Sequence, residues 1–416
     1  MHFLKSLVPQ ALKNLYHLAQ AVSANIRYGF PSRKLKIIGV TGTDGKTTTT
    51  QLIVRIFEEA GYKVAMASTI NFKIGAKEWV NSSKYTTMAA FSTQKFLRQA
   101  ADEGCEYAVL ETGSHALDQY RVWGIRYAVA VVTNITREHL DYHKTMEAYR
   151  KAKKRLFDQA DSAVVNLDME NPDEFLRGDH VQKITYSTQD ALAQIAARDI
   201  ELRLDGSTFK VGDRLFELSL PGAFNIENAL AAIGAGVSQG IGLETMAEAL
   251  KKVTGVPGRM EKVPNERGLE ILIDYAVTPN ALEKLYSLVS EMKPKGTSKV
   301  IAVLGACGDR DRGKRPIMGK IVSEHADVVI LTNEDPYYED PERILDEIAQ
   351  GIVGRNENQD YFRIMDRREA IGKALKLAQE GDIVVITGKG AEESMAIAQK
   401  RIPWNDKCVI LELLAK

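Results

Sequence analysis

The sequence predicts an α/β protein in which parallel sheets carry helices on both faces. Short runs of β-branched residues alternate along the chain with segments whose apolar residues recur at helical spacing, an order typical of parallel sheets. A glycine-punctuated turn, GTDGKT (42–47), lies between the first apolar run and the first helical segment. The length of 416 residues exceeds one compact core, so we expect a larger central domain followed by a smaller Rossmann-like α/β domain.

Short runs rich in valine, isoleucine and leucine are the expected strands. They cover residues 35–40, 107–112, 127–135, 162–167, 270–275, 299–306, 327–332 and 382–388. Helical spacing is clearest in residues 47–61, 228–240 and 340–353. Residues 202–220 alternate polar and apolar between turn signals, which predicts antiparallel strands.

The expected domain boundary lies in VPGRMEKVPNERG (256–268), where proline and glycine cluster before a new strand begins at Glu270. We therefore divide the chain into three parts. They are a short basic amphipathic segment at 1–35, a central domain at 36–265 and a C-terminal domain at 266–416.

The N-terminal segment is basic and has apolar residues at roughly helical spacing over residues 3–22, interrupted by Pro9. Such a helix can lie on an anionic membrane as a peripheral contact. The alternative, which we prefer, is a helix packed on the following domain. Residues 1–43 contain no acidic residue, and their cations are Lys5, Lys13, Arg27, Arg33, Lys34 and Lys36.

Composition excludes several classes of protein. Lys+Arg and Asp+Glu balance at 55 each, which argues against a dedicated nucleic-acid binder. Cys105, Cys307 and Cys408 are scattered without metal-like spacing, which is typical of reduced thiols. The sequence shows neither a signal peptide nor an apolar run of the ~20 residues that span a bilayer. We expect a cytoplasmic monomer.

The turn at 42–47 has the chemistry of a phosphate-binding loop. Gly42 and Gly45 allow a tight turn whose successive N–H groups can point at phosphate oxygens. Lys46 can reach the β- and γ-phosphates, and the Thr47 hydroxyl can ligate Mg²⁺. Val40 stands where the strict G-x(4)-G-K-[ST] pattern has its first glycine. With GKT between a strand and a helix, we expect ATP or GTP binding.

Two further strand ends carry polar residues suited to such a site. The strand at 107–112 ends in Glu111, with Ser114 and His115 just beyond it. Ligand-binding residues are expected at the carboxyl ends of parallel strands, and a triphosphate site needs carboxylates to hold its metal. The strand at 127–135 supplies a second such end, which carries Asn134, His139, Asp141 and His143.

These residues belong to a series of phrases that resembles the Mur ligase superfamily, most closely the MurE type. The resemblance runs from about residue 36 to residue 400. The phrases, in order, are GVTGTDGKTTT, YTT, ETGSHALDQYRVWGI, TNITREHLDYHKTMEAYRKAK, PGAFNIENALAA, PGRME, DYAVTPNAL, GDRDRGKRP, NEDPYYEDP and GKGAEE.

The resemblance implies a P-loop-type central ATPase domain and an ATP-dependent ligase of peptidoglycan biosynthesis. In the implied reaction, ATP converts a carboxylate of a peptidoglycan-precursor peptide into an acyl phosphate. The amine of a free amino acid then displaces phosphate and forms an amide. Metal ions and Lys46 would neutralise the crowded phosphates.

The resemblance also implies the roles of individual residues. Thr47 and Glu111 would hold a first Mg²⁺ and His139 would contribute to a second. Lys153 matches a lysine that family members carry as a carbamate, which would make it an anionic ligand. The alternative is that Lys153 is one solvated cation of the run RKAKKR. The implied catalytic residues are Lys46, Glu111, His139 and Lys153.

Further matches concern the nucleotide and the substrates. The implied nucleotide-binding residues are Gly42, Thr43, Asp44, Gly45, Lys46, Thr47 and Thr48 of the turn, with Asn225, Asn228, Arg259 and Asp274. The cluster Asp309, Arg310, Asp311, Lys314 and Arg315 matches positions that help to close the domain over ATP, although a plain surface cluster would look similar. Thr86, Thr87, Ser114, Gln119 and Arg121 match positions that contact the acceptor peptide.

Three departures from the family pattern bear on the substrates. Only about 35 residues precede the first strand, where MurE-type enzymes carry a domain that grips the UDP-sugar. Tyr337 in EDPY replaces an arginine that clamps the distal carboxylate of diaminopimelate. With Glu334, Asp335 and Glu392 as substrate residues, we expect a basic amino acid such as lysine. Val277 and Ala391 replace histidines of the family.

Other functions remain open from the sequence. A Mur-like ligase could act on a lipid-linked or free peptide, or could build a poly-amino acid or folate polyglutamate. The phrases SHALDQYRV and HLDYH favour the MurE type over the last two. A nucleotide-binding scaffold that has lost catalysis is a further alternative. It would not need to retain every metal-site residue.

Overall fold

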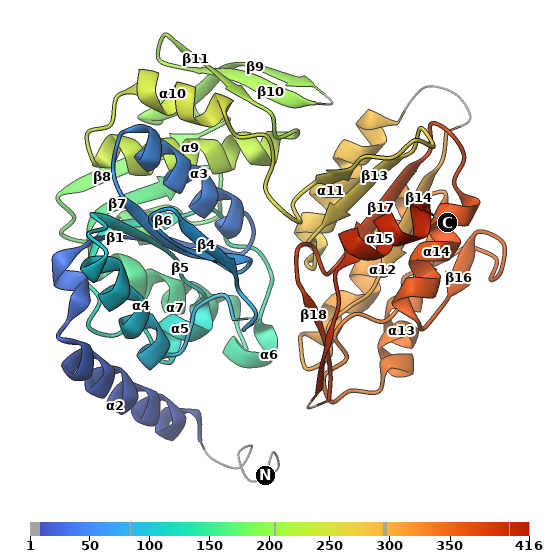
Figure 1. Ribbon diagram of the computed structural model, residues 1–416, viewed down its shortest axis with the longest axis horizontal. Helices are drawn as coiled ribbons and strands as arrows, with labels where there is room; N and C mark the ends of the chain where they lie inside the picture. The colour runs from blue at the N-terminus through green and yellow to red at the C-terminus, as the bar shows by residue number, and fades with distance from the viewer. Residues whose placement is uncertain (1–8, 84, 204, 294–297, 399, 416) are drawn as a thin grey trace. The chain divides into compact units, whose positions relative to one another are not determined.

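The computed structural model describes residues 9–83, 85–203, 205–293, 298–398 and 400–415. The chain divides into two compact units, which are coloured by residue number in Figure 1. The first unit comprises Met1–Thr136 and His143–Thr254, and the second comprises Arg137–Tyr142 and Gly255–Lys416. Residues 1–8, which form the start of the expected amphipathic segment, lie outside the described part of the chain. The three-part division of the sequence at 35 and 265 stays a prediction.

The first unit is built on one mixed sheet. Its strands run parallel from β2 to β9 in spatial order, and antiparallel strands extend it at both edges. In spatial order the strands are β11 (Arg214–Leu218), β10 (Gly206–Val211), β9 (Ile195–Arg203), β8 (Gln182–Ser187), β7 (Ala160–Asn166), β6 (Tyr127–Val132), β1 (Lys36–Thr41), β5 (Tyr107–Glu111), β2 (Val64–Ala67), β3 (Asn71–Ile74) and β4 (Lys77–Val80).

Helices cover both faces of this sheet, as the alternation of patterns predicted. The helices α3, α9 and α10 pack together on one face, and α4, α5 and α7 lie on the other (Figure 1). Every residue of β5 is consequently buried, which explains its continuous apolar run. The helices are α2 (Gln10–Tyr28), η1 (Pro31–Lys34), α3 (Lys46–Glu59), α4 (Ala90–Asp102), α5 (Ser114–Asp118), α7 (Met146–Phe157), α8 (Asp173–Leu176), α9 (Ala223–Ser238) and α10 (Leu243–Lys251). A short helix, α6 (Leu140–His143), spans the division between the units.

The antiparallel strands expected in residues 202–220 are confirmed by the pairing of β10 with both β9 and β11. The hairpin formed by β3 and β4 was not expected from the sequence. Its outer strand, β4, is exposed along its whole length, so it lacks the buried apolar run that marks the central strands.

The second unit contains a smaller, mostly parallel sheet. The helices α11, α12 and α13 pack against one another, and α14 and α15 form a separate pair. In spatial order the strands are β12 (Glu261–Val263), β13 (Glu270–Asp274), β17 (Ile383–Thr387), β14 (Val300–Leu304), β15 (Val328–Leu331) and β16 (Tyr361–Arg363), and a hairpin of β18 (Ser394–Ile397) and β19 (Lys400–Pro403) stands apart. The helices are α11 (Pro279–Met292), η2 (Arg312–Lys314), α12 (Arg315–His325), α13 (Pro341–Ala349), α14 (Arg367–Leu377) and α15 (Asp406–Leu414). The α/β fold class predicted from the sequence is confirmed.

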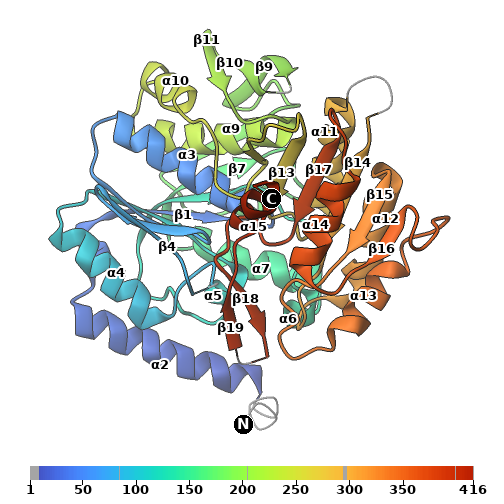
Figure 2. The same ribbon diagram turned by 45° about the vertical axis from the view of Figure 1, so that its right-hand side comes forward.

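The N-terminal helix α2 begins directly after Pro9, which fits the tolerance of proline only at helix starts. It packs along α4, as Figure 2 shows, so the expected packing on the following domain is confirmed. The Asn25 side chain, which is buried, donates hydrogen bonds to the carbonyls of Ala21 (2.9 Å) and Trp123 (2.8 Å). Of the helices that the structure describes, none has both the length and the hydropathy needed to cross a bilayer.

Candidate functional site

The phosphate-type turn lies between β1 and α3. Thr133 and Asn134, the two residues that follow β6, hold it by hydrogen bonds. Thr43 N donates to the carbonyl of Asn134 (2.8 Å), and Asp44 N donates to its Oδ1 (2.9 Å). The Thr133 hydroxyl donates to the carbonyl of Asp44 (2.6 Å). A Cβ added at Gly42 would lie 1.8 Å from Thr133 Oγ1, so this approach requires glycine. The turn is therefore a braced loop with a fixed backbone.

Lys46 opens α3 and reaches back over this loop. Its Nζ donates to the carbonyls of Gly42 (3.0 Å) and Thr43 (2.6 Å). The ammonium group thus lies at the loop itself, beside the N-terminus of a helix of 14 residues. A helix N-terminus and a lysine at the same loop form an environment that favours anions such as phosphate.

Asn225 and Asn228, expected near the nucleotide, project from α9 toward the same loop. A Cβ added at Gly45 would lie 2.1 Å from Asn228 Oδ1, and Gly45 has a φ of +80°. Asn228 Nδ2 donates to Asn225 Oδ1 (3.2 Å), and Asn225 Nδ2 donates to the carbonyl of Pro221 (2.8 Å). Asn228 therefore contacts the turn at Gly45, and Asn225 holds the Asn228 side chain.

Glu111 lies at the carboxyl end of β5, where strand-end reasoning expected a ligand. Its carboxylate is buried and accepts a hydrogen bond from the Thr47 hydroxyl at Oε2 (3.0 Å). Thr69 also donates to it, through its N–H at Oε2 (2.7 Å) and through its hydroxyl at Oε1 (2.8 Å). The structure thus brings Glu111 and Thr47 together at the start of α3.

Lys153 is buried on α7, so it is not one of the solvated cations of its charge run. Its Nζ donates to the carbonyl of Gly42 (2.6 Å) and lies 4.5 Å from the centre of the Tyr149 ring. The other cations of RKAKKR lie at least partly in solvent. The structure therefore places Lys153 at the phosphate-type turn, whose backbone its ammonium group contacts.

The residues expected at the acceptor peptide gather next to Glu111. Thr87 Oγ1 donates to the carbonyl of Glu111 (3.0 Å), and Arg121 donates to the carbonyl of Thr87 (2.8 Å). The hydroxyl oxygen of Thr86 lies 3.3 Å from that of Thr69, whose own proton is donated to Glu111. Two further residues lie on α5, with Ser114 at its start and Gln119 at its C-cap.

His143 forms a hydrogen bond with Ser114, 3.0 Å between His143 Nε2 and Ser114 Oγ. Burial lowers the pKa of His143 to about 4, assisted by Lys153 and Arg155 and opposed by Asp118. The imidazole is therefore neutral at physiological pH and can keep the Ser114 hydroxyl in one orientation.

This depressed pKa predicts how stability depends on pH. Below the ordinary value of 6.5 the unfolded chain binds a proton at His143 that the folded protein does not bind until about pH 4. The free energy of unfolding should consequently fall as the pH drops through this window, by at most roughly 2 kcal/mol near pH 5, because solvent screening weakens the effect. Above pH 6.5 the residue contributes no pH dependence. Urea unfolding of the wild type and of His143→Gln at about pH 7 and about pH 5 tests this, and equal losses in both would contradict it.

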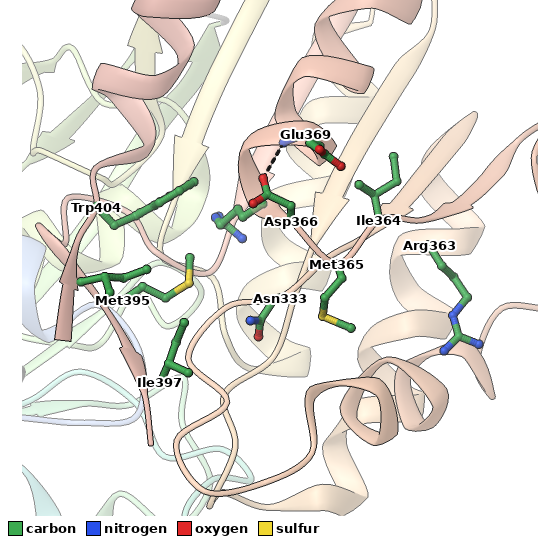
Figure 3. A pocket seen from close by; sticks show the side chains of 11 residues that line it. Asn333, Arg363, Ile364, Met365, Asp366, Glu369, Met395, Ile397 and Trp404 are labelled. Atoms are coloured by element: carbon green, nitrogen blue, oxygen red, sulfur yellow. Dashed lines mark hydrogen bonds between the residues drawn. The ribbon is translucent and has the colours of Figure 1, made fainter. Parts of the chain in front are cut away.

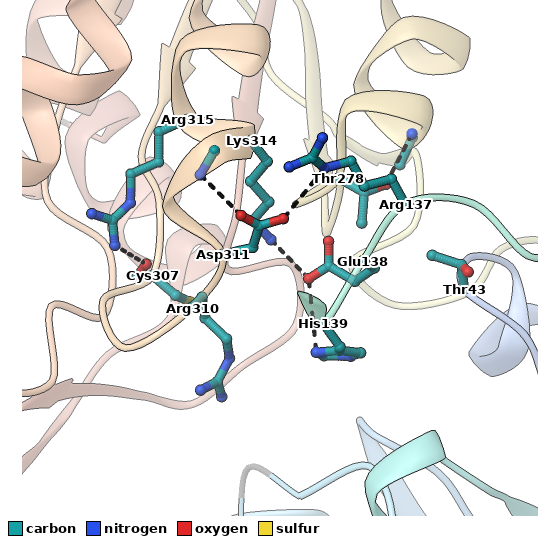
Figure 4. A network of polar contacts seen from close by, with 12 residues as sticks. Thr43, Arg137, Glu138, His139, Thr278, Cys307, Arg310, Asp311, Lys314 and Arg315 are labelled. Atoms are coloured by element: carbon teal, nitrogen blue, oxygen red, sulfur yellow. Dashed lines mark hydrogen bonds and ion pairs between the residues drawn. The ribbon is translucent and has the colours of Figure 1, made fainter. Parts of the chain in front are cut away.

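His139 belongs to the segment Arg137–Tyr142, which is part of the second unit. Figure 4 shows it beside Glu138, with His139 Nδ1 3.9 Å from Glu138 Oε1. Lys314 donates to the same oxygen at 2.9 Å, and both partners of this pair are buried. Arg137 forms an ion pair with Asp311 (3.5 Å). Two members of the expected cluster, Lys314 and Asp311, thus hold this segment within the second unit.

Asp274 ends β13, and the PGRME turn that carries Arg259 contacts this strand end. Asp274 Oδ2 accepts a hydrogen bond from Met260 N (2.7 Å), and the Arg259 guanidinium lies 4.6 Å from the centre of the Tyr275 ring. A Cβ at Gly258 would lie 2.1 Å from the backbone nitrogen of Ala391. The PGRME turn is therefore packed directly against the GKGAEE loop within the second unit.

The substrate residues of the second unit surround a buried lysine. Lys389 Nζ donates to both oxygens of Asp335 (3.1 and 3.0 Å) and also to Glu392. Lys389 is fully buried, and its positive charge balances part of the negative charge of the carboxylates that we expected to make this site acidic. Glu334 accepts a hydrogen bond from the Cys307 thiol (3.0 Å). Burial, together with Asp335, raises the pKa of Glu334 above its ordinary range.

Arg310 lies 5.5 Å from the centre of the Tyr337 ring and donates to the carbonyl of Asp309 (3.0 Å). Arg315 donates to the carbonyl of Cys307 (3.0 Å) and to the carboxylates of Glu339 and Glu347. The arginines of the expected cluster therefore have different surroundings. Arg315 is buried and forms ion pairs within the fold, whereas Arg310 faces the phenol of Tyr337, which stands where the family has an arginine.

A pocket of about 650 Å³ lies within the second unit, and Figure 3 shows the residues that line it. The charged groups at its edge are engaged in the fold, since Asp366 caps α14 by accepting from Glu369 N (2.9 Å) and Arg363 pairs with Asp346 (2.7 Å). We assign it no part in the reaction. Its apolar lining comes from Ile364, Met365, Met395, Ile397, Ile402 and Trp404.

The sequence did not reveal two residues of the site. Thr69 follows β2, whose four residues gave too short a run to be recognised as a strand, although the strand-end rule would then have singled it out. Lys389 stands in GKGAEE, but its partners Asp335 and Glu392 could not be assigned because Asp335 is 54 residues away.

The residues at the phosphate-type turn fit a magnesium nucleotide. Mg²⁺ is usually held by one or two carboxylates together with substrate phosphates and water. Glu111 and the Thr47 hydroxyl supply hard oxygen atoms beside the loop. Within the described residues, no group of three or more His, Cys, Asp or Glu side chains forms a self-sufficient metal site. Phosphate oxygens would therefore have to complete the coordination, as in a nucleotide complex.

Two family models match the chain. The Mur ligase middle domain matches residues 40–236, and the Mur ligase glutamate ligase domain matches residues 258–390. The chain is 40% identical over 432 aligned residues to the UDP-N-acetylmuramyl-tripeptide synthetase of Roseiflexus sp. (strain RS-1), covering 98% of this chain and 83% of that protein. It is 39% identical to the UDP-N-acetylmuramoyl-L-alanyl-D-glutamate–2,6-diaminopimelate ligase of Clostridium botulinum, with coverages of 95% and 81%.

Solved structures agree with this assignment. A UDP-N-acetylmuramoyl-L-alanyl-D-glutamate–2,6-diaminopimelate ligase superposes with a TM-score of 0.60 at 36% identity, over 92% of this chain and 78% of that one. The folylpolyglutamate synthase of Mycobacterium tuberculosis, solved with ADP and AMPPCP, shares the fold with a TM-score of 0.73 at 18% identity, over 89% and 92% of the two chains. With a braced phosphate-type turn, a buried Glu111 and these relatives, the chain belongs to the Mur ligase family of ATP-dependent carboxylate–amine ligases.

Proposed function

We propose that this chain is a MurE-type ligase that joins a free amino acid to a peptidoglycan-precursor peptide through an acyl phosphate. The observation that carries the proposal is the contact of Thr47 with Glu111 beside the loop that Lys46 and Lys153 also contact. This arrangement supplies a cation, a hydroxyl and a carboxylate at one phosphate-type turn. The names of the relatives support a UDP-linked acceptor, and we propose the cytoplasm, where ATP is supplied, as the place of reaction.

We propose that Thr47 and Glu111 hold a first Mg²⁺ and that His139 contributes to a second, with Lys153 joining as a carbamate. The cations would neutralise the triphosphate as charge develops on the acyl phosphate. A neutral Lys153 amine can react with carbon dioxide, and its contact with the Gly42 carbonyl keeps its nitrogen at the loop. Lys46 would bind the phosphates. The turn residues Thr43, Asp44 and Thr48 and the side chains of Asn225, Asn228, Arg259 and Asp274 complete the proposed nucleotide set.

We propose further that Thr86, Thr87, Ser114, Gln119 and Arg121 bind the acceptor peptide. Glu334, Asp335 and Glu392 would receive the incoming amino acid. Lys389 pairs with two of these carboxylates, Asp335 and Glu392. Tyr337 offers no positive charge to a second carboxylate. We therefore propose a basic amino acid such as lysine in preference to diaminopimelate.

A panel of substrates tests this function directly. Purified protein receives ATP and Mg²⁺ with UDP-linked, lipid-linked or free dipeptide acceptors and with lysine, ornithine or diaminopimelate, and mass spectrometry identifies the product. We expect one amide product on the UDP-linked acceptor, with lysine or ornithine preferred. A product only on the lipid-linked or free acceptor would instead establish the alternative ligase, and ATP binding without phosphate release would establish the scaffold.

The Tyr337→Arg variant sharpens the amino-acid assignment. The introduced guanidinium would stand beside Arg310 and could clamp the distal carboxylate of diaminopimelate by a bidentate pair. We expect the kcat/KM ratio of diaminopimelate to lysine to rise about tenfold or more. Tyr338→Arg, at the exposed neighbouring position, is the matched control and should leave the ratio unchanged. A wild-type preference for diaminopimelate would refute the assignment.

A further inference from the structure

The helix α2 presents four large apolar side chains to solvent, holds Leu18 and Val22 half-buried, and buries small or polar side chains. Ala21, Ala24 and Asn25 are buried on the side that packs along α4. On the opposite side, the exposed fractions are 58% for Leu12, 62% for Leu15, 61% for Tyr16 and 67% for Ile26. This distribution is the reverse of that of a surface helix of an ordinary globular domain.

The exposed apolar residues lie in a stripe along one side of the helix, where Ser23 is the exposed polar residue between Ala19 and Ile26. Successive helical residues turn by about 100°, so positions separated by three, four or fourteen residues lie close to one line. Leu12, Leu15, Tyr16 and Ile26 have these separations, and Ala19 lies exposed between them. The stripe therefore extends along most of the 19-residue helix.

Positive charge accompanies this stripe. Residues 1–43 contain six lysine and arginine residues and no aspartate or glutamate, although the whole chain is neutral. Arg27 is exposed at the last turn of α2, and Arg33 and Lys34 are exposed just beyond it. Asp118 on α5 contacts α2 through Asn14 (3.1 Å) and also pairs with Arg155 (3.3 Å).

We propose that the stripe of α2 (Leu12, Leu15, Tyr16, Ala19 and Ile26) docks on an anionic lipid surface. Apolar side chains would enter the boundary of the acyl chains, and the flanking cations would stay with the lipid phosphates. Charge favours this occupant over a second copy of the chain. An isologous contact through the same stripe would bring two cationic segments together without acidic residues from those segments to pair with them.

The test uses the 416-residue chain and vesicle flotation. Vesicles of phosphatidylcholine alone are compared with vesicles of phosphatidylcholine and phosphatidylglycerol in equal parts. We expect the wild type to float with the anionic vesicles and not with the neutral ones. Binding should weaken at about 0.5 M salt, because screening shortens the reach of the charges.

The double variant Leu12→Glu/Leu15→Glu should lower the bound-to-free ratio about tenfold or more. Leu192→Glu is the matched control, because Leu192 is an apolar residue of the same unit with an exposed fraction of 92%, and it should bind as the wild type does. Both variants change exposed positions, and their circular dichroism spectra and melting temperatures verify folding.

Three outcomes would overturn the proposal. They are the failure of the wild type to float with anionic vesicles, binding that survives Leu12→Glu/Leu15→Glu, and a wild-type dimer in light scattering that this double variant dissociates. The last outcome would identify a second copy as the occupant of the stripe. Ligase activity on soluble substrates is expected to be equal in all variants, so this test is independent of the proposed reaction.

Discussion

Lys46→Ala should abolish ATP-dependent amide formation, with a loss in kcat of about 1000-fold or more. The Lys46 ammonium lies over the phosphate-type turn, where it donates to the carbonyls of Gly42 and Thr43. It is placed to balance the negative charge of phosphates at the helix N-terminus. Its removal should leave the loop intact, because Thr133 and Asn134 hold the backbone from the neighbouring strand end.

Phosphate release and product mass are the measurements for this variant. Lys63→Ala is the matched control, because Lys63 is half-exposed on the same unit and pairs with Glu103. The control should retain wild-type turnover and the same thermal midpoint. Undiminished amide formation by Lys46→Ala would remove the basis of the proposed function.

Glu111→Gln should lower turnover by about 100- to 1000-fold and raise the concentration of Mg²⁺ needed for half-maximal rate. The substitution keeps the shape of the side chain but removes the negative charge beside Thr47. The fold should tolerate it. The amide oxygen can still accept from Thr69 N, and the Thr69 hydroxyl can turn to accept from the new amide.

A magnesium titration of the reaction rate distinguishes a metal-binding role from a purely structural one. Glu106→Gln is the control, since Glu106 is exposed just before the same strand. A variant that has lost its fold would show a lower melting temperature at every Mg²⁺ concentration. Wild-type turnover of Glu111→Gln at ordinary Mg²⁺ would show that this carboxylate holds no catalytic metal.

Local pattern was enough to predict the central parts of the fold. The runs that became β1, β5, β6 and β13 are apolar on both faces because helices cover both sides of each sheet. The turn before α3 was recognisable because its glycines, lysine and threonine are consecutive. Short elements with mixed composition escaped notice. The outer strand β4 is exposed along its length and has no apolar run to reveal it.

The sequence by itself determined the α/β class, the phosphate-type turn and the family, because each depends on residues that are neighbours in the chain. Only the tertiary structure decided which charges compensate one another and which face of α2 meets solvent. Lys389 neutralises Asp335 across 54 residues, and Lys153 reaches Gly42 across 111. Such contacts depend on which strands and loops lie next to one another in the fold. The spacing of neighbouring residues in the sequence does not encode this arrangement.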